Sequence, residues 1–279
     1  MKPTINFSPT ISIVLPTHNG AQYLKQSIES CLKQTYPNIE LVIVNDGSTD
    51  TTVEIINSFN DARIKYISLP TNKGIVAALN KGFSETTGEF LSWTSDDNCY
   101  TVNAFEVMLK TLENEENIDF VYANYHMIDV NGKVLKSGHV ENPQGLDRDN
   151  YVGGCFLYRR KVYEIIGDFN AEAFLVEDYE YWLRVRAQFC MKKLDDFLYY
   201  YRMHGSSLTT AHGLEKIQDQ VERIRAAYIS PWKQDFLIGK RFFYKKDFSK
   251  SRTFLLKSLT MYPFYYQTWR LLIKGILRK

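Results

Sequence analysis

The sequence lacks several features that would assign it to a common class of protein. Its 279 residues contain no run that approaches the roughly 18 apolar residues needed by a membrane-spanning helix. Its four cysteines form neither a C-x-x-C pair nor a spacing typical of metal ligands. A chain of this length does not depend on disulfides, so we expect free thiols in a reducing compartment. The cysteines are Cys31, Cys99, Cys155 and Cys190.

Glycine-rich loops that bind phosphate are also missing. The first apolar run, Ile11–Leu15, is not followed by G-x-G-x-x-G, and no G-x-x-x-x-G-K-[ST] occurs. Their absence argues against a Rossmann dehydrogenase and a P-loop enzyme, so a phosphate-rich ligand would be held through a metal ion. A signal peptide is not expected, because only Lys2 precedes this short run. We therefore expect a cytoplasmic protein.

Charge is unevenly distributed along the chain, although the net charge is only +2. Of the 34 basic and 32 acidic residues, 12 and 2 fall within residues 231–279, which leaves 22 and 30 in residues 1–230. This asymmetry predicts an acidic catalytic part and a basic C-terminal part that faces an anionic surface. The alternative is a solvated helical face without a partner.

The first half of the chain alternates short apolar runs with helical patterns. This order predicts a mostly parallel α/β sheet with right-handed crossovers. A capping box, Thr51-x-x-Glu54, is expected to open the second helix, which continues to Phe59. The predicted strands are Ile11–Leu15, Ile39–Val44, Arg63–Ser68, Glu89–Thr94 and Asp119–Ala123, and the other helices are Ala21–Gln34, Gly74–Glu85 and Thr101–Glu115.

The pattern changes after Tyr125. Asn131-Gly132 is a hairpin-type turn, and two further strands flank a helix, which predicts a mixed sheet in this part. From Leu214 onward all patterns are helical, with breaks at Pro231 and Pro263. We therefore expect a catalytic domain in residues 1–212 and a basic helical region in residues 213–279. The later strands are Tyr151–Tyr158 and Met191–Met203, and the helix between them is Tyr179–Gln188.

Polar and acidic residues follow three of the predicted parallel strands. They are Pro16-Thr17-His18-Asn19-Gly20, Asn45-Asp46-Gly47-Ser48-Thr49-Asp50 and Ser95-Asp96-Asp97-Asn98. The carboxyl ends of parallel strands share one edge of the sheet, where ligands bind. Helix capping favours the same residue types, but it does not explain two adjacent aspartates after an apolar strand. Because neighbouring carboxylates repel each other, this pair predicts a divalent cation site.

Seven motifs in this order resemble the family 2 glycosyltransferases with the GT-A fold. The first four are I-S-I-V-L-P-T-H-N-G, V-N-D-G-S-T-D, N-K-G-(x)5-N-K-G-(x)5-G-E-F and S-D-D-N. The others are G-G-C-F-L-Y-R-R-(x)6-G-D-F from Gly153, V-E-D-Y-E-Y-W-L-R from Val176 and Y-R-M-H-G-S-S-L-T from Tyr201. The resemblance covers roughly residues 10–210, and its specificity rests on the ordered series of motifs.

The resemblance implies an inverting, metal-dependent glycosyltransferase of the hexosyltransferase type. Such an enzyme moves a sugar from a nucleotide-diphosphate sugar to an acceptor hydroxyl. A UDP- or dTDP-linked donor, Mn²⁺ or Mg²⁺, and a glycan or lipid-linked acceptor are implied, with bacterial cell-surface polysaccharide as the product. No nucleic-acid partner is expected. Acceptor contacts are expected near Gly153–Phe156 and Ser137–Asn150.

The resemblance also assigns roles to individual residues. Asp178 would be the catalytic base with Glu177 beside it, and Asp97 and His204 would bind the metal. Two departures bear on the nucleotide contacts. Thr94 stands where many members carry a further Asp, and Ala78 and Leu79 stand where many carry Arg. The nucleotide-sugar contacts would be Pro16, Thr17, Asn19, Asp46, Asn80, Asp96 and Arg202.

Simpler roles and other functions compete with these assignments. Asp46 could be a turn residue, Asp178 could cap a helix that begins at Tyr179, and His204 could be an ordinary loop histidine. A nucleotidyltransferase would share the sheet and the acidic pair, but it should carry a Gly- and Arg-rich loop after the first strand. A non-catalytic sugar-nucleotide binding module would not need Glu177 and Asp178.

Two local patterns give further expectations. The start of a helix favours a negative charge, so Asp178 is expected to be held ionised by the helix dipole and free N–H groups. At the other end of the chain, a basic amphipathic pattern predicts an interfacial helix that contacts an anionic membrane. The alternative is that this helix packs on its own domain. Its apolar residues are Trp269, Leu272, Ile273, Ile276 and Leu277, and its basic residues are Arg270, Lys274 and Arg278.

Overall fold

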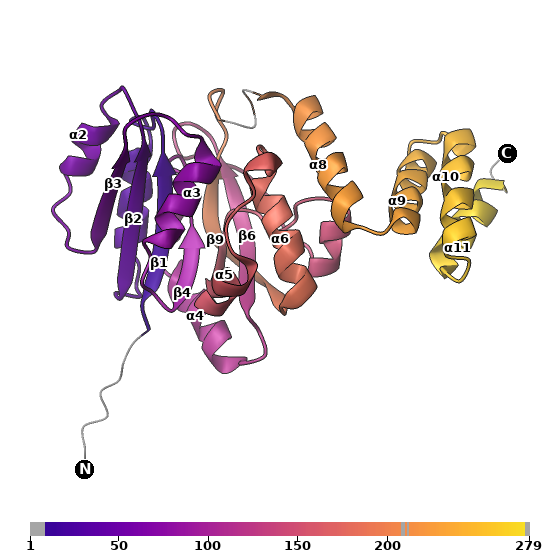
Figure 1. Cartoon of the computed structure of the whole chain (residues 1–279), viewed down its shortest axis with the longest axis horizontal. Coiled ribbons are helices and arrows are strands. Elements are labelled where there is room, and N and C mark those ends of the chain that lie inside the picture. Colours follow the sequence, from indigo (N-terminus) through magenta and orange to yellow (C-terminus); the bar gives the residue numbers. More distant parts are fainter. Residues whose placement is uncertain (1–8, 208–209, 211, 277–279) are drawn as a thin grey trace, which may run out of the picture. The chain divides into compact units, whose positions relative to one another are not determined.

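The chain divides into two compact units, Met1–Leu214 and Glu215–Lys279. A computed structural model describes residues 9–207, 210 and 212–276 (Figure 1). A nine-stranded sheet forms the centre of the first unit. Its strands are β1 (Ile11–Thr17), β2 (Ile39–Asp46), β3 (Ile64–Leu69), β4 (Phe90–Trp93), β5 (Cys99–Tyr100), β6 (Phe120–Ile128), β7 (Val134–Gly138), β8 (Phe156–Arg159) and β9 (Met191–Arg202).

The sheet is parallel in its first half and mixed in its second. The strand order is β3-β2-β1-β4-β8-β6-β9-β5, and β7 pairs with β6. β1 is parallel to both β2 and β4, and β2 is parallel to β3. β8 runs antiparallel to both β4 and β6, whereas β6 and β9 are parallel. The predicted parallel strands and the later change to a mixed sheet are therefore confirmed.

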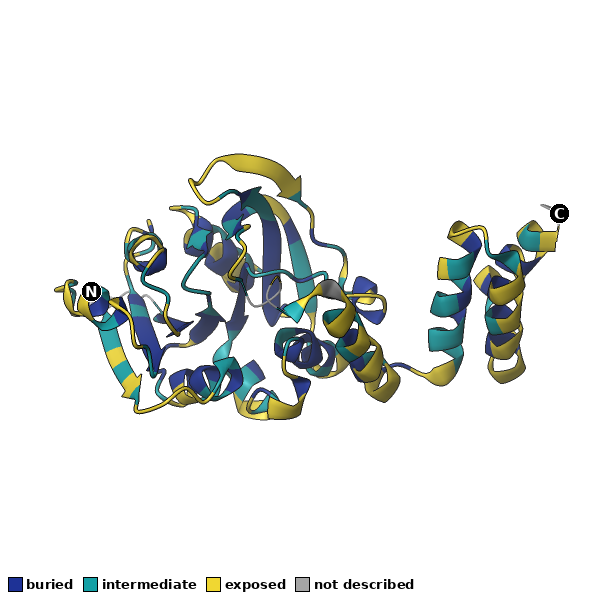
Figure 2. Cartoon of the chain, turned by 90° about the horizontal axis from the view of Figure 1, so that it is seen from above, coloured by how far each residue is buried: buried dark blue, intermediate teal, exposed yellow. Residues whose placement is uncertain are grey.

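Helices cover both faces of this sheet (Figure 1). On one face, apolar side chains of α1 (Leu24–Leu32) and α4 (Ala104–Asn114) join those of β1 and β2 in one core cluster. On the other face lie α3 (Ile75–Ser84), α5 (Arg160–Ile166) and α6 (Glu177–Gln188). Burial on both faces explains why the central parallel strands β1 and β2 are nearly continuous apolar runs. Buried residues such as theirs are dark blue in Figure 2, whereas the edge strand β3 is intermediate to exposed.

Aromatic rings dominate the core on the α6 side. Trp182 of α6 lies 4.7 Å from Phe156 and 5.0 Å from Phe120, measured between ring centroids. Phe120 stacks on Tyr158 with centroids 5.5 Å apart. All four side chains are fully buried. Since such rings each bury a large apolar area, this cluster fixes α6, and with it the first turn of that helix.

Three local predictions are corrected by the structure. Thr51 makes no side-chain cap of α2 (Thr52–Asn57); instead, Asp50 Oδ1 accepts the N–H of Thr52 at 3.0 Å. β8 starts at Phe156 rather than Tyr151, since residues 151–155 include Gly153 in the left-handed region with φ of 72°. α6 begins at Glu177, so Glu177 and Asp178 lie inside its first turn.

The second unit is helical, as its sequence pattern predicted. Pro231 begins α9, where a missing N–H costs no hydrogen bond. Gly239 lets α9 approach α10 closely, because a Cβ there would lie 2.7 Å from Leu255, and Ser251 donates to the carbonyl of Gly239. The helices are α8 (Leu214–Tyr228), α9 (Pro231–Tyr244), α10 (Phe248–Met261) and α11 (Tyr266–Ile276).

The final helix is buried on one side and exposed on the other. Leu271 and Leu272 join the small core of the second unit. Trp269, Ile273 and Ile276 are each about half exposed. Leu277 and Arg278 of the predicted stripe lie outside the described residues. Within the part of the chain that the structure describes, no helix is both long and apolar enough to cross a membrane.

Gly47 provides a stability test of the loop after β2. Its φ is 66°, and a Cβ there would lie 2.6 Å from backbone atoms of Thr71 and Asn72. Gly132, with φ of 85°, has nothing near its Cβ position. We predict that Gly132→Ala lowers the free energy of unfolding by about 1–2 kcal/mol through backbone strain alone. Gly47→Ala should lower the free energy of unfolding by at least about 1 kcal/mol more, because its Cβ would also overlap the backbone of residues 71–72.

Urea denaturation of both variants measures this difference. Equal losses at the two positions would show that the loop after β2 can move away from residues 71–72 without cost.

Candidate active site

Three loops meet at the carboxyl edge of β1, β2 and β4. Parallel pairing sets Thr17 beside Asn45 and Val14 beside Trp93, so the three strands end together. Thr17 Oγ1 donates to Asp96 Oδ2 at 2.5 Å. The backbone N–H of Asn19 donates to Ser48 Oγ at 2.9 Å. The predicted common rim of these loops is therefore confirmed.

Asp46 joins the rim to the start of α3. Its carboxylate accepts the backbone N–H of Lys73 at 2.7 Å and that of Gly74 at 2.8 Å, one on each oxygen. Its own carbonyl accepts from His18 Nδ1 at 2.8 Å. The side chain is only 3% exposed. Through these contacts the Asp46 carboxylate holds the surrounding loops together. This is the turn-residue role, the alternative to nucleotide binding.

Asp96 lies directly over the loop after β1. A Cβ on Gly20 would collide with the Asp96 carboxylate and with the Thr17 hydroxyl, so a larger residue there would displace these two side chains. Burial raises the pKa of Asp96 to about 6, and the neighbouring Asp97 adds to the rise while the Thr17 hydrogen bond opposes it. A cation at this edge would remove the electrostatic cost of ionising Asp96.

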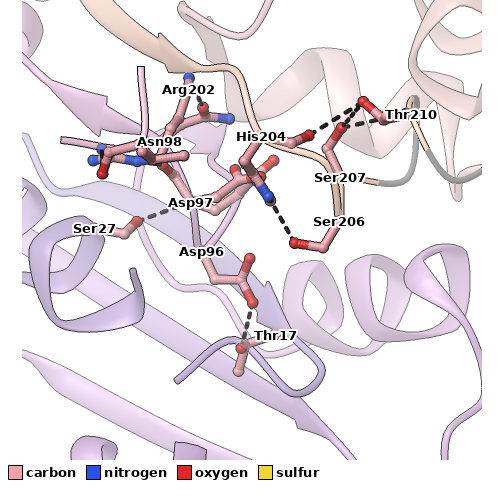
Figure 3. A network of polar contacts seen from close by, with 12 residues as sticks. Thr17, Ser27, Asp96, Asp97, Asn98, Arg202, His204, Ser206, Ser207 and Thr210 are labelled. Carbon is pink, nitrogen blue, oxygen red and sulfur yellow. Dashed lines mark hydrogen bonds and ion pairs between the residues drawn. The ribbon is translucent and has the colours of Figure 1, made fainter. Parts of the chain in front are cut away.

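Asp97 faces His204, as Figure 3 shows. Asp97 Oδ2 lies 2.9 Å from His204 Nε2, and His204 Nδ1 lies 2.8 Å from Ser206 Oγ. Asp97 Oδ1 is buried without a hydrogen-bond partner among the described residues. The structure therefore brings both predicted metal ligands together from loops far apart in the sequence. No group of three or more potential metal-binding side chains occurs in residues 9–207, 210 and 212–276.

Arg202 is buried beside the Asp97 loop. It is 2% exposed, and its guanidinium lies 4.5 Å from the centre of the Tyr23 ring. Arg202 Nε donates to the carbonyl of Asp97 at 2.9 Å, and Nη2 donates to Gln26 Oε1 at 2.7 Å. Nη1 donates to the carbonyl of Asp129 at 3.1 Å. These bonds tie α1, the Asp97 loop and the end of β6 to the end of β9.

The structure also places two other predicted contacts, Asn80 and Pro16, and Thr94, the residue that departs from the family pattern. Asn80 donates to the carbonyl of Phe169 at 2.9 Å and accepts its N–H at 2.8 Å, so both halves of its amide are engaged. Thr94 is 1% exposed, and its hydroxyl lies 2.7 Å from the Tyr199 hydroxyl. Pro16 is buried within β1. The nucleotide roles of Pro16 and Asn80 remain predictions.

A second acidic site lies at the start of α6. Asp178 Oδ1 accepts the N–H of Tyr179 at 2.6 Å, and Asp178 Oδ2 accepts Asn150 Nδ2 at 2.6 Å. Glu177 is 7% exposed, and its Oε2 is buried without a partner in the described part of the chain. The helix cap is Val176, so Asp178 is not the N-cap. Leu175 precedes this turn with φ of 75°, a strained conformation for leucine.

Burial outweighs the helix dipole at these two carboxyls. It raises the pKa of Glu177 to about 7, with the charge of Asp178 as a second cause. It also raises the pKa of Asp178 above its ordinary value, although the hydrogen bonds from Tyr179 and Asn150 oppose the rise. The expectation that the dipole keeps Asp178 fully ionised is therefore wrong in direction. The raised pKa brings this carboxyl closer to the range in which a general base is effective at neutral pH.

Comparison with known proteins identifies the family. The sequence model described as Glycosyl transferase family 2 matches residues 12–167. The chain belongs to this family. An uncharacterized glycosyltransferase of Rickettsia felis is 34% identical over 197 residues, which are 66% of this chain and 32% of that protein. The chain thus spans about a third of the length of this relative.

Two further similarities concern a synthase and a solved structure. Hyaluronan synthase of Pasteurella multocida is 28% identical over 210 residues, which are 73% of this chain and 21% of that protein. S. aureus TarS 1–349 in complex with UDP-GlcNAc superposes with a TM-score of 0.66 at 19% identity, covering 95% of this chain and 79% of that one. At this identity the likeness concerns the fold, and the expected GT-A fold is confirmed.

Within this site, sequence reasoning missed three side chains. Tyr23 and Gln26 hold the Arg202 guanidinium, and Asn150 holds Asp178. Tyr23 and Gln26 look like ordinary residues of an amphipathic helix. Asn150 was predicted only as the last residue of Ser137–Asn150, a segment expected to contact the acceptor. No spacing in the sequence connects Asn150 with Asp178, 28 residues later.

Glu177 gives a prediction about stability and pH. Its pKa is 4.5 in the ordinary state and about 7 in the folded protein, so between these values the folded protein binds more protons than the unfolded one. The free energy of unfolding therefore falls as the pH rises through this window. Glu177→Gln cannot ionise, so relative to wild type it should gain stability from pH 4.5 to pH 8, by about 2–3 kcal/mol.

Urea denaturation at several pH values measures this gain, with Glu116→Gln on the surface as the control. Parallel pH profiles of the wild type and Glu177→Gln would contradict the buried, proton-binding state of Glu177.

Proposed function

We propose that this chain is an inverting glycosyltransferase that moves a sugar from a nucleotide-diphosphate sugar to an acceptor hydroxyl. The observation that carries the proposal is Asp178, a carboxyl with a raised pKa held between Asn150 Nδ2 and the N–H of Tyr179. A module that only bound sugar nucleotides would gain nothing from a desolvated carboxyl at this position. Family membership supplies the reaction class in which such a group is needed.

The nucleotide sugar is placed at the rim formed by the loops after β1, β2 and β4. Thr17, Asn19, Asp46 and Asp96 come together there. TarS, which shares the fold, is known in complex with UDP-GlcNAc. A UDP-linked sugar is therefore the first donor to test, with dTDP-linked sugars next.

The chemical step follows from a carboxylate near an acceptor hydroxyl. The hydroxyl oxygen forms a bond to the anomeric carbon as the bond from that carbon to the diphosphate oxygen breaks. The hydroxyl proton passes to Asp178, and the electron pair of the broken bond leaves with the nucleotide diphosphate. Attack from the face opposite the leaving group inverts the anomeric configuration. Glu177 and Asp178 interact and titrate as a pair, so the charge on Glu177 affects how readily Asp178 takes the proton.

Mn²⁺ or Mg²⁺ fits the Asp97–His204 pair. Asp97 Oδ1 is buried and unpaired among the described residues, and His204 Nε2 lies beside the other oxygen. Hard divalent cations commonly use few protein ligands and complete their shell with water and substrate phosphate. A bound metal would stabilise the negative charge that develops on the departing diphosphate. Asp97 and His204 would hold it, with Arg202 positioning the Asp97 backbone from below.

A nucleotidyltransferase is the other enzymatic candidate. It would also use an acidic pair near the rim, but it should carry a Gly- and Arg-rich loop after β1. The loop here is Thr17-His18-Asn19-Gly20, which contains no arginine. A nucleotidyltransferase would also have no role for the buried Asp178, and this favours glycosyl transfer.

The acceptor is proposed to be a growing glycan or a lipid-linked glycan. Hyaluronan synthase, a polysaccharide-forming relative by name, is similar over 73% of this chain. The loop containing Asn150 reaches Asp178, so the acceptor hydroxyl should approach between this loop and α6. Synthesis of a bacterial cell-surface polysaccharide is the corresponding cellular role.

Asp178→Asn tests the proposed function. We predict that it lowers kcat at least about 10²-fold, because the acceptor proton loses its base, while the Kd for the nucleotide sugar stays nearly unchanged. UDP release measures turnover, and calorimetry measures donor binding. Asp195→Asn, on an exposed carboxylate of β9, is the control that should keep wild-type kcat. Wild-type turnover in Asp178→Asn would place the base elsewhere.

Metal dependence is tested at Asp97. We predict that EDTA abolishes turnover and that Mn²⁺ or Mg²⁺ restores it in the wild type. Asp97→Asn should bind UDP equally with and without metal, because it removes a charged ligand. Calorimetry with and without metal provides the comparison. Full activity of the wild-type protein in EDTA would contradict a metal role.

The second unit is proposed to contact an anionic membrane, which would place the enzyme on the inner face of the membrane. Trp269, Ile273 and Ile276 leave an exposed apolar strip on α11, and Phe264 just before it is 85% exposed. Arg270 and Lys274 lie on the same helix, within a region of 12 basic and 2 acidic residues. Each basic residue near an anionic surface contributes about 1 kcal/mol. The buried Leu271 and Leu272 keep the helix packed on its own unit at the same time.

Trp269→Glu combined with Ile273→Glu tests this contact. We predict that the wild type floats with phosphatidylglycerol vesicles but not with phosphatidylcholine vesicles, and that the double variant remains at the bottom of the gradient. Val134→Glu combined with Leu135→Glu, at similarly exposed positions of β7, should float like the wild type. Equal flotation of both double variants would rule out α11 as the membrane contact.

A further inference from the structure

Among the described residues, Asn150 is the side chain that donates a hydrogen bond to the proposed base, Asp178. It lies after the 3-10 helix η1 (Pro143–Asp147), and its Nδ2 donates to Asp178 Oδ2 at 2.6 Å. The other oxygen of Asp178 is held by the N–H of the following residue, Tyr179. The N–H of Tyr179 belongs to the backbone of α6, so its position cannot change unless the helix moves. Asn150 is therefore the contact of Asp178 that a substitution can alter, and it sets the orientation of the carboxylate.

The orientation of the Asn150 amide comes at a cost. Its Oδ1 is buried and makes no hydrogen bond to any residue that the structure describes. A buried acceptor without a partner costs free energy. A residue selected for packing would avoid this cost, so the geometry indicates a side chain placed for what its Nδ2 does to Asp178.

We propose that Asn150 is a positioning residue that orients Asp178 and sets the pH range in which it can accept a proton. This inference rests on the proposed function of Asp178. The amide donates a stronger hydrogen bond to the ionised carboxylate than to the neutral acid, so it favours the form that acts as a base. The bond also restricts rotation of the carboxylate, which leaves a fixed lone pair for the acceptor hydroxyl.

Few other charges act on Asp178. Burial is the largest influence and raises its pKa, and the nearby Asp149 adds to the rise. Glu177 next to it is coupled to the same proton equilibrium. Asp147 is paired with Arg186 at 2.8 Å. The remaining charged side chains of α6 and of the helices packed against it are Glu180, Arg184, Glu172, Arg160, Lys161 and Glu164. The strands that pack on Trp182 add Arg159 of β8 and His126 of β6.

Three substitutions separate the contributions of the amide. Asn150→Ala removes the donor, so the pKa of Asp178 should rise by about one unit, the scale of a hydrogen bond to a charged group. Asn150→Asp removes the donor and adds a carboxylate, so the rise should be larger. Asn150→Ser keeps a donor and should lie between the wild type and Asn150→Ala. Asn142→Ala, on an exposed asparagine whose side chain makes no cap hydrogen bond, is the matched control.

The titration is measured by carbon NMR on the full chain with ¹³C-labelled aspartate. Asp178→Asn assigns the Asp178 signal, and circular dichroism verifies folding of each variant. Because this readout needs no substrate, it stays informative even if the protein turns over no donor. A pKa of Asp178 that is the same in Asn150→Ala, Asn150→Ser and the wild type would overturn the proposal.

Turnover provides the second readout. In the wild type, kcat for UDP release from UDP-GlcNAc, or from the donor found active, should have an acid limb set by the acidic pair. In Asn150→Ala that limb should move to higher pH, so that kcat at a fixed pH on the limb falls about 10-fold, while the Kd for the donor is unchanged. An unchanged acid limb beside a uniformly lower kcat would show that Asn150 acts only through local structure.

Discussion

The parallel pairing of β1 with β2 and β4 is the constraint on which the nucleotide site depends. It makes three strands end at one edge, so that Thr17, Asp46 and Asp96 are neighbours although they are far apart in the sequence. The core clusters on both faces keep these strands in register. A shift of one residue would exchange the faces of every side chain and separate the loops. The polar rim is thus a consequence of how the apolar residues pack.

Desolvation gives the two acidic sites different chemistry. At the rim, Asp96 and Asp97 lie beside each other, and a cation with His204 would relieve their repulsion. At the start of α6, burial raises the pKa of both Glu177 and Asp178, and the only side-chain hydrogen bond that opposes the rise at Asp178 comes, among the described residues, from Asn150. Under the proposed function, the first acidic pair would bind a diphosphate through metal, and the second would accept a proton.

The sequence predicted what depends on local patterns and missed what depends on long-range packing. The strands Ile11–Thr17 and Ile39–Asp46 are apolar runs, and family motifs pointed to Asp97, Asp178 and His204. Arg202 was predicted to contact the nucleotide sugar, which stays a prediction, but the sequence did not show that it is buried against the Asp97 carbonyl and the Tyr23 ring. The dipole argument for Asp178 failed because the sequence does not reveal how deeply a helix start is buried. Asn150 could not be found, since only the fold brings it to α6.

The central claim is that one direct displacement, assisted by Asp178, transfers the sugar with inversion. Real-time proton NMR of the wild-type protein hydrolysing an α-linked donor such as UDP-GlcNAc tests it without knowledge of the acceptor. Because water then takes the place of the acceptor hydroxyl, the free sugar should first appear as the β-anomer and only later equilibrate with the α-anomer. An α-anomer that appears first would contradict the account, because it would require a double displacement through a covalent intermediate.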